Sequence, residues 1–182
     1  AHQTYAYFVR SPHARAQIKN IDITKAKKAS GVVDVLTGKD IVNDKIGGLI
    51  AGWRIKSEDG SDMKVPPHPP LASESVNYVG DHVAVVIAES LDEARNAAEL
   101  VKVDYKVLKA VVKTDEAMKS DSIYKDIPKN LCFDWLLGDR AKVKEAFDKA
   151  DKIIKIDLIN NRLIPNAMEP RAANADYNPS TE

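Results

Sequence analysis

Residues that could carry out chemistry are few in this chain, and they lie far apart in sequence. The usual metal ligands and nucleophiles are limited to four histidines and one cysteine, His2, His13, His68, His82 and Cys132. No two histidines stand four residues apart and no His-Glu-x-x-His motif occurs, which excludes a zinc site on one helix face. We interpret His82 as a residue at the end of a strand, and His68, which lies between prolines, as a loop residue.

The single cysteine is better explained by packing than by reactivity. Cys132 is flanked by Leu131 and Phe133, and nothing nearby in sequence would stabilise a thiolate. We therefore predict a buried thiol. A lone cysteine also excludes an internal disulfide framework and a Cys-x-x-Cys redox or metal motif.

Two glycine-containing stretches invite comparison with ligand-binding loops. The segment 47–52 (GGLIAG) has the glycine content of a phosphate loop but lacks the Lys-Ser/Thr pair and opens no recognisable helix, so we interpret it as a flexible connection. The segment 78–81 (YVGD) is interpreted as a turn that leads into a strand, with Gly80 supplying a backbone angle that other residues resist.

One charged pair stands in an apolar setting. Glu169 and Arg171 are surrounded by Pro165, Met168, Pro170 and Ala172, where a charge needs a partner. They could contact a substrate or cofactor, or they could form an ion pair or backbone clamp that fixes a loop. We favour the structural alternative.

Composition narrows the class of protein. The 27 basic and 27 acidic residues give a formal net charge of zero, and no basic run is interleaved with aromatics, so we expect no nucleic-acid partner. No apolar run reaches the length of about 18 residues that would span a bilayer, and the first residues lack the pattern of a signal peptide. Low cysteine usage fits the reducing cytoplasm.

Hydrophobic periodicity predicts strands separated by short helices. Expected strands are Tyr5–Arg10, Gln17–Asp22, Val32–Thr37, Val83–Ala88, Val101–Val107, Ile153–Asn160 and Ala175–Tyr177. Val83–Ala88 is continuously apolar, which is typical of a strand covered on both faces. This mixture of strands and short helices favours an α+β fold.

Capping residues predict where the helices begin. Asp22 is expected to cap a helix over 23–29, with Gly31 left-handed beyond its end. Ser90 and Glu93 should form a capping box. Further helices are expected over 115–119 and after Asp139. The apolar face of the Ser90 helix is expected to hold Leu91, Ala94, Ala98 and Val101.

Between about Gly38 and Ala72, glycines and the run Pro66-Pro67-His68-Pro69-Pro70 predict irregular structure for most of the segment. A connection of this length in a compact domain is usually functional or packed against a partner, so we expect it to form a contact surface.

Five segments in this order resemble the large subunit of molybdenum hydroxylases. They are 7–14 (YFVRSPHA), 31–38 (GVVDVLTG), 78–86 (YVGDHVAVV), 92–105 (DEARNAAELVKVDY) and 168–173 (MEPRAA). The group includes carbon-monoxide dehydrogenases, aldehyde oxidases and xanthine dehydrogenases, and 168–171 is most similar to the carbon-monoxide-dehydrogenase-like subfamily. The chain departs slightly from the family pattern at Lys106 and Lys109.

The resemblance implies an α/β hammerhead domain over 1–112, a linker with a helix and a strand over 113–160, and the start of a truncated molybdopterin-binding domain over 161–182. It also implies a molybdenum-pterin cofactor elsewhere in the full subunit, and partner subunits that carry iron–sulfur clusters and FAD. None of the family's catalytic or cofactor-binding motifs occurs in this chain, so we expect no catalytic, cofactor-binding or metal residues here.

Two hypotheses of function follow. The first is an N-terminal fragment of such a large subunit, structural and inactive alone. The second is a free-standing module of hammerhead shape that binds a partner or small ligand. The sequence leaves the substrate open among carbon monoxide, aldehydes and purines.

Overall fold

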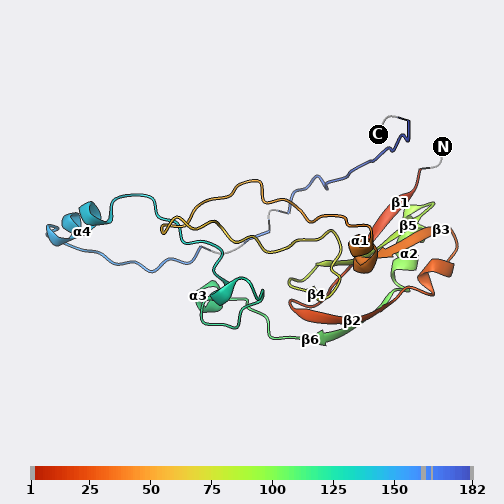
Figure 1. Cartoon of the computed structure of the whole chain (residues 1–182), viewed down its shortest axis with the longest axis horizontal. Coiled ribbons are helices and arrows are strands. Elements are labelled where there is room, and N and C mark those ends of the chain that lie inside the picture. Colours follow the sequence, from red (N-terminus) through yellow and green to blue (C-terminus); the bar gives the residue numbers. More distant parts are fainter. Residues whose placement is uncertain (1–2, 161–162, 165, 181–182) are drawn as a thin grey trace. The chain divides into compact units, whose positions relative to one another are not determined.

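The computed structural model describes residues 3–160, 163–164 and 166–180, and the chain divides into two compact units between Leu137 and Gly138. His2 and Pro165 lie outside the described residues. The elements in chain order are β1 (Tyr5–Arg10), β2 (Ala16–Asp22), the 3-10 helix η1 (Ala26–Lys28), β3 (Val32–Thr37), α1 (Gly38–Asn43), β4 (Ser75–Val76), β5 (His82–Ala88), α2 (Leu91–Ala98), β6 (Lys102–Val107), α3 (Thr114–Ala117), the 3-10 helix η2 (Pro128–Asn130) and α4 (Arg140–Asp148) (Figure 1).

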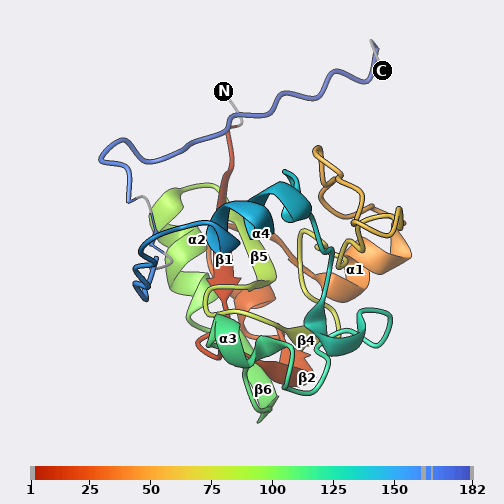
Figure 2. The ribbon, with the colours of Figure 1, turned by 90° about the vertical axis from the view of Figure 1, so that its left-hand side faces the viewer.

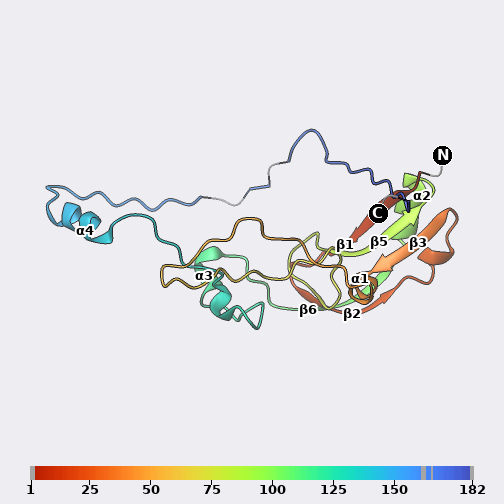
Figure 3. The same cartoon turned by 45° about the horizontal axis from the view of Figure 1, so that its top comes forward.

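Two three-stranded antiparallel sheets make up the first unit. In one sheet β5 lies between β1 and β3 (Figure 3). In the other, β2 lies between β4 and β6 (Figure 1). Along β5, Val86 is opposite both Tyr7 of β1 and Val35 of β3. Five of the predicted strands are thereby confirmed, within a residue at their ends.

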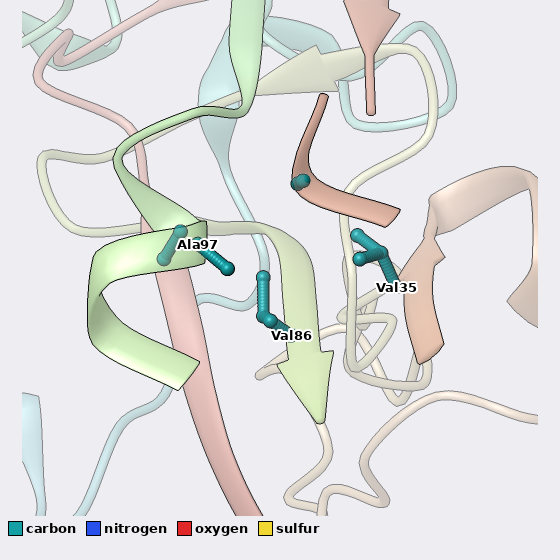
Figure 4. Packing of buried hydrophobic residues seen from close by; sticks show 5 residues of the cluster. Val35, Val86 and Ala97 are labelled. Carbon is teal, nitrogen blue, oxygen red and sulfur yellow. The ribbon is translucent and has the colours of Figure 1, made fainter. Parts of the chain in front are cut away.

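The central strand β5 is buried on both faces, as its apolar run predicts. Val86 packs with Val35 and with Ala97 of α2 (Figure 4). On the opposite face Val85 packs with Ile41 and Leu71. Helix α2 lies against β1 and β5 (Figure 2), so one face of this sheet is covered by a helix.

Helix α2 begins where the sequence indicates. The Ser90 hydroxyl accepts a hydrogen bond from the Glu93 amide at 3.3 Å and donates one to the Glu93 carboxylate at 2.7 Å. The prediction for the buried face is wrong at Leu91, which is 53% exposed. Ala97 is buried instead, because the face that meets the sheet runs through Ala94, Ala97 and Ala98 at helical spacing.

Most of the segment 38–72 is irregular, as predicted, but its first residues, 38–43, form the helix α1. The backbone amide and the hydroxyl of Thr37 both donate to the Asp40 carboxylate, at 2.6 and 2.8 Å. These bonds, the backbone one first, lower the pKa of Asp40. The turn of helix that results places Ile41 against Leu71 in the core.

The helix expected over 23–29 is shorter than predicted. Only the single 3-10 turn of η1 forms, although Asp22 accepts a hydrogen bond from the Thr24 amide at 2.9 Å. Gly31 is left-handed, with φ of +72°, as expected. The carboxylate of Glu93 occupies the space where a Cβ on Gly31 would lie.

In the second unit the helix predicted after Asp139 is confirmed as α4. The Asp139 carboxylate accepts hydrogen bonds from the amides of Ala141 and Lys142, both at 3.0 Å. The strands predicted over 153–160 and 175–177 are wrong for this structure, in which the described residues of both segments form no strand. A strand exists only where a neighbour completes its hydrogen bonds, and a sequence pattern cannot supply that neighbour.

Candidate interface

His82 opens β5, as predicted, and it joins two segments that are distant in sequence. Its ring stacks on Phe8 with 4.5 Å between ring centroids, and its backbone carbonyl accepts a hydrogen bond from the Ala72 amide at 2.7 Å. Burial, and then the positive charge of Arg10, lower the pKa of His82. The neutral imidazole is therefore favoured, in a position that suits packing.

The other described histidines also contact aromatic rings. The Nε2 of His68 lies 3.2 Å from the Tyr78 hydroxyl, with the two rings perpendicular, and His13 packs edge-on against Tyr105. Burial raises the pKa of Tyr78. Among the residues that the structure describes, no three His, Cys, Asp or Glu side chains are grouped so that they could hold a metal ion.

A cavity of about 590 Å³ opens beside the proline-rich segment. Its walls include Pro66, His68, Tyr78 and Tyr124. The polar groups around it are bonded to one another. The backbone amide of Asn77 donates to Asp81 and its side-chain amide donates to the Tyr124 hydroxyl, both at 3.1 Å. Within the first unit, these bonds tie the segment around Tyr124 to the turn that precedes β5.

The glycine-containing segment 47–52 is packed against its own chain. The Leu49 amide donates to the carbonyl oxygen of His68 at 2.8 Å, and a Cβ on Gly48 would lie 2.9 Å from the same oxygen. The Leu49 amide is therefore bonded within the protein instead of to a ligand, which supports the interpretation of this segment as a connection. The turn at 78–81 is confirmed, with Gly80 at φ of +93°.

Cys132 lies in a segment that is hydrogen-bonded to a small hairpin around residues 56–62. The hairpin is closed by a bridge and an ion pair of 2.7 Å between Lys56 and Asp62. Its Lys64 amide donates to the carbonyl of Cys132 at 2.9 Å, and its Glu58 amide donates to the carbonyl of Asp134 at 2.7 Å. The prediction of a buried thiol is wrong in degree, because Cys132 is only half-buried at the edge of a second cavity, of about 410 Å³.

Glu169 and Arg171 are both exposed in the described part of the second unit. Neither of the alternatives considered for them, a ligand contact or a loop clamp, has support from the geometry. Sequence reasoning singled them out for their apolar neighbours. Of these, the described Met168, Pro170 and Ala172 are exposed as well, with Met168 at 93%.

Exposed apolar side chains are the most prominent surface feature of both units. In the first unit they gather in the irregular connection and in the segment 131–137, and they include Leu49, Ile50, Trp53, Phe133, Trp135 and Leu137. In the second unit they include Val143 and Phe147 of α4, and Ile153, Ile154, Ile156, Leu158, Ile159, Leu163 and Ile164. Large exposed apolar patches are typical of interaction sites. The geometry thus fits an interface better than a catalytic centre.

Comparison with known proteins points to a single family. Residues 1–109 match the family described as aldehyde oxidase and xanthine dehydrogenase, a/b hammerhead domain. The carbon monoxide dehydrogenase large chain of Afipia carboxidovorans is 33% identical over 178 residues, which cover 89% of this chain and 20% of that protein. The nicotine 6-hydroxylase large subunit of Paenarthrobacter nicotinovorans is 32% identical over 181 residues, 96% of this chain and 21% of the relative.

A solved structure shows the same fold. Carbon monoxide dehydrogenase from Oligotropha carboxidovorans superposes with a TM-score of 0.65 at 31% identity, over 82% of this chain and 19% of that one. The present chain thus spans about a fifth of the length of these relatives. The two small sheets and few helices are those of the hammerhead fold, and the chain belongs to the aldehyde oxidase and xanthine dehydrogenase family, with its hammerhead domain matched over residues 1–109.

Proposed function

We propose that this chain is the hammerhead part of the large subunit of a molybdenum hydroxylase similar to the carbon monoxide dehydrogenase large chain. Its role is structural: it packs against the remainder of that subunit, and it does not catalyse oxidation alone. One observation carries this proposal. The match to a large chain five times longer covers 89% of the residues, so it continues past residue 109 into the segments whose apolar side chains are exposed.

The residues present do not fit an iron–sulfur cluster. A cluster of the usual kind takes four cysteine ligands, and this chain has one cysteine. From the family resemblance, we place the molybdenum-pterin cofactor in the remainder of the large subunit, and the iron–sulfur clusters and FAD in partner subunits.

The domain boundaries remain part of this proposal. We assign the hammerhead to residues 1–112, a linker to 113–160 and the beginning of the molybdopterin-binding region to 161–182. The cytoplasm is the proposed compartment. None of the helices within the described ranges has the length and apolar character that a bilayer crossing requires.

The isolated 182-residue chain tests this proposal directly. After incubation with molybdenum-pterin cofactor and gel filtration, we expect no stoichiometric molybdenum in the protein peak, and no oxidation of carbon monoxide, aldehydes or purines. Stoichiometric molybdenum or turnover by the isolated chain would contradict the assignment of chemistry to the remainder. Tight binding of another small ligand would instead favour the free-standing module.

A further inference from the structure

The cavity of about 590 Å³ beside the proline-rich segment has the size of a small-molecule site. Its walls come from the segments 49–51 and 65–69, from most residues of 72–78, and from Asp81 and Tyr124. All of these residues belong to the first unit. This unit alone therefore forms the cavity.

Two tyrosine rings border the cavity and are held in place by hydrogen bonds. The Tyr124 hydroxyl accepts from the side-chain amide of Asn77 at 3.1 Å, and the Tyr78 hydroxyl lies 3.2 Å from Nε2 of His68. Burial, with a smaller contribution from the charge of Asp81, raises the pKa of both tyrosines. Both rings are therefore neutral phenols at neutral pH, and the faces of such rings attract cations.

A buried carboxylate borders the same cavity. Asp81 is only 8% exposed, and it accepts a hydrogen bond from the backbone amide of Asn77 at 3.1 Å. None of the ion pairs in the described part of the chain includes Asp81. The guanidinium of Arg10 is directed to the carbonyl oxygen of Gly80, at 3.3 Å. Buried charges are usually paired, so this carboxylate is available to a cation in the cavity.

The walls fit an organic cation better than an anion or a metal ion. Asp81 and Glu74 are both carboxylates, and the described lining residues include no lysine or arginine, so an anion would meet repulsion. The described residues contain no group of three ligands that could hold a metal ion. The apolar wall, which includes Leu49 and Pro66, suits an organic body.

We propose that this cavity binds a small organic cation, with a protonated amine at Asp81 and its apolar body against Tyr78 and Tyr124. The carboxylate supplies charge-assisted hydrogen bonds, and the rings supply cation–π attraction. This inference goes beyond the proposed function, because it assigns a ligand to the first unit itself.

Two ligands of similar shape and different charge test the proposal. Benzylammonium carries the cation, and benzyl alcohol replaces it with a neutral hydroxyl. Calorimetry measures the binding of each to the 182-residue chain and to the native assembly that carries this sequence. We expect benzylammonium to bind with a dissociation constant on the order of 1 mM, roughly tenfold tighter than benzyl alcohol. Equal affinity for the two ligands would overturn the proposal.

A pair of variants locates the charge that the cation recognises. Asp81→Asn removes the carboxylate and nearly keeps its shape, whereas Asp92→Asn removes an exposed carboxylate in the first turn of α2, away from the cavity. We expect Asp81→Asn to lose the tenfold preference for benzylammonium and Asp92→Asn to keep it. Equal losses in both variants would assign the preference to the net charge of the chain and would overturn the site.

A second pair tests the rings and does not require Asp81→Asn to fold. Tyr124→Phe keeps the ring and Tyr124→Leu removes it, while both lose the hydroxyl that accepts from Asn77. We expect the phenylalanine variant to retain the preference for benzylammonium and the leucine variant to weaken it several-fold. Equal affinity for benzylammonium in both variants would contradict the proposed site.

The native assembly shows whether the cavity is open where the protein works. Binding of benzylammonium to the assembly, with the same preference over benzyl alcohol, would support the site. Binding to the 182-residue chain that is absent from the assembly would overturn it, because other protein would then fill the cavity. Neither result bears on the proposed function, which the molybdenum and turnover measurements test separately.

Discussion

Gly38 begins helix α1 in direct contact with the backbone that precedes β4. A Cβ at this position would lie 2.4 Å from the carbonyl oxygen and 2.5 Å from the carbonyl carbon of Ala72, which are backbone atoms that cannot rotate away. The contact brings α1 against the strand-like end of the irregular connection. It explains why the connection can be long in sequence and still be fixed to the core.

This contact predicts that Gly38→Ala destabilises the chain by about 1–3 kcal/mol, the usual cost of overpacking. Helix propensity alone predicts that Gly38→Ala stabilises the chain, since alanine is the better helix former. Urea denaturation of Gly38→Ala and of Gly52→Ala provides the test. Gly52 has nothing within 4 Å of a Cβ and serves as the matched control, with a change near zero. Stabilisation by Gly38→Ala would show that the Ala72 contact yields without cost.

His82 gives a prediction about pH. Its folded pKa is lowered from 6.5 by burial, so between the folded and unfolded pKa values the unfolded chain binds a proton more readily. The free energy of unfolding should therefore fall as the pH drops below 6.5, and level off below the folded pKa.

Urea denaturation between about pH 7.5 and about pH 5.5 measures that dependence. His82→Phe keeps an aromatic ring beside Phe8 but cannot titrate, and its stability should depend less steeply on pH over the same range. An unchanged slope in the variant would show that other groups account for the acid sensitivity.

At the scale of elements, the hammerhead strands could be predicted because their patterns are local. The alternation of β6 and the continuous apolar run of β5 each specify a strand and how much of it is covered. Helix α1 could not be predicted in the same way. The helix is indicated in sequence only by the capping pair Thr37 and Asp40, which precedes a glycine-rich stretch. The burial of its Ile41 depends on Leu71, thirty residues later in the chain.

The candidate site was less predictable than the fold. The sequence predicted His82 at the end of a strand and His68 in a loop, which the structure confirms, but it could not identify the aromatic partners Phe8 and Tyr78. The hairpin that holds Cys132 depends on hydrogen bonds between segments about seventy residues apart. Local patterns carry no information about such distant pairings.

The cap of α2 offers a test at this scale. Ser90→Ala removes the hydroxyl that accepts from the Glu93 amide, and the expected loss is about 1 kcal/mol in the free energy of unfolding. The loss should be global, because α2 buries three alanines in the core. Ser90→Thr retains the hydroxyl and should keep most of the stability. Equal losses in both variants would assign the effect to packing at residue 90 instead of to the cap.

At the scale of the whole molecule, the two units differ in how many of their residues they bury. The first unit contains the buried clusters around Val86, Val83 and Val85. In the second unit every described residue is exposed, including the apolar face of α4. A unit that buries nothing cannot offset the entropy of ordering its chain, so its order must depend on contacts beyond those it makes within itself.

We propose that this sequence is one part of a larger subunit, in which the exposed apolar side chains of the second unit are covered. Native mass spectrometry combined with metal analysis, on the assembly that carries this sequence in its source cells, tests the claim most directly. The account predicts that the sequence occurs within a polypeptide several times longer than 182 residues, in an assembly with stoichiometric molybdenum. A free 182-residue chain that is stable, folded and free of molybdenum in those cells would contradict it.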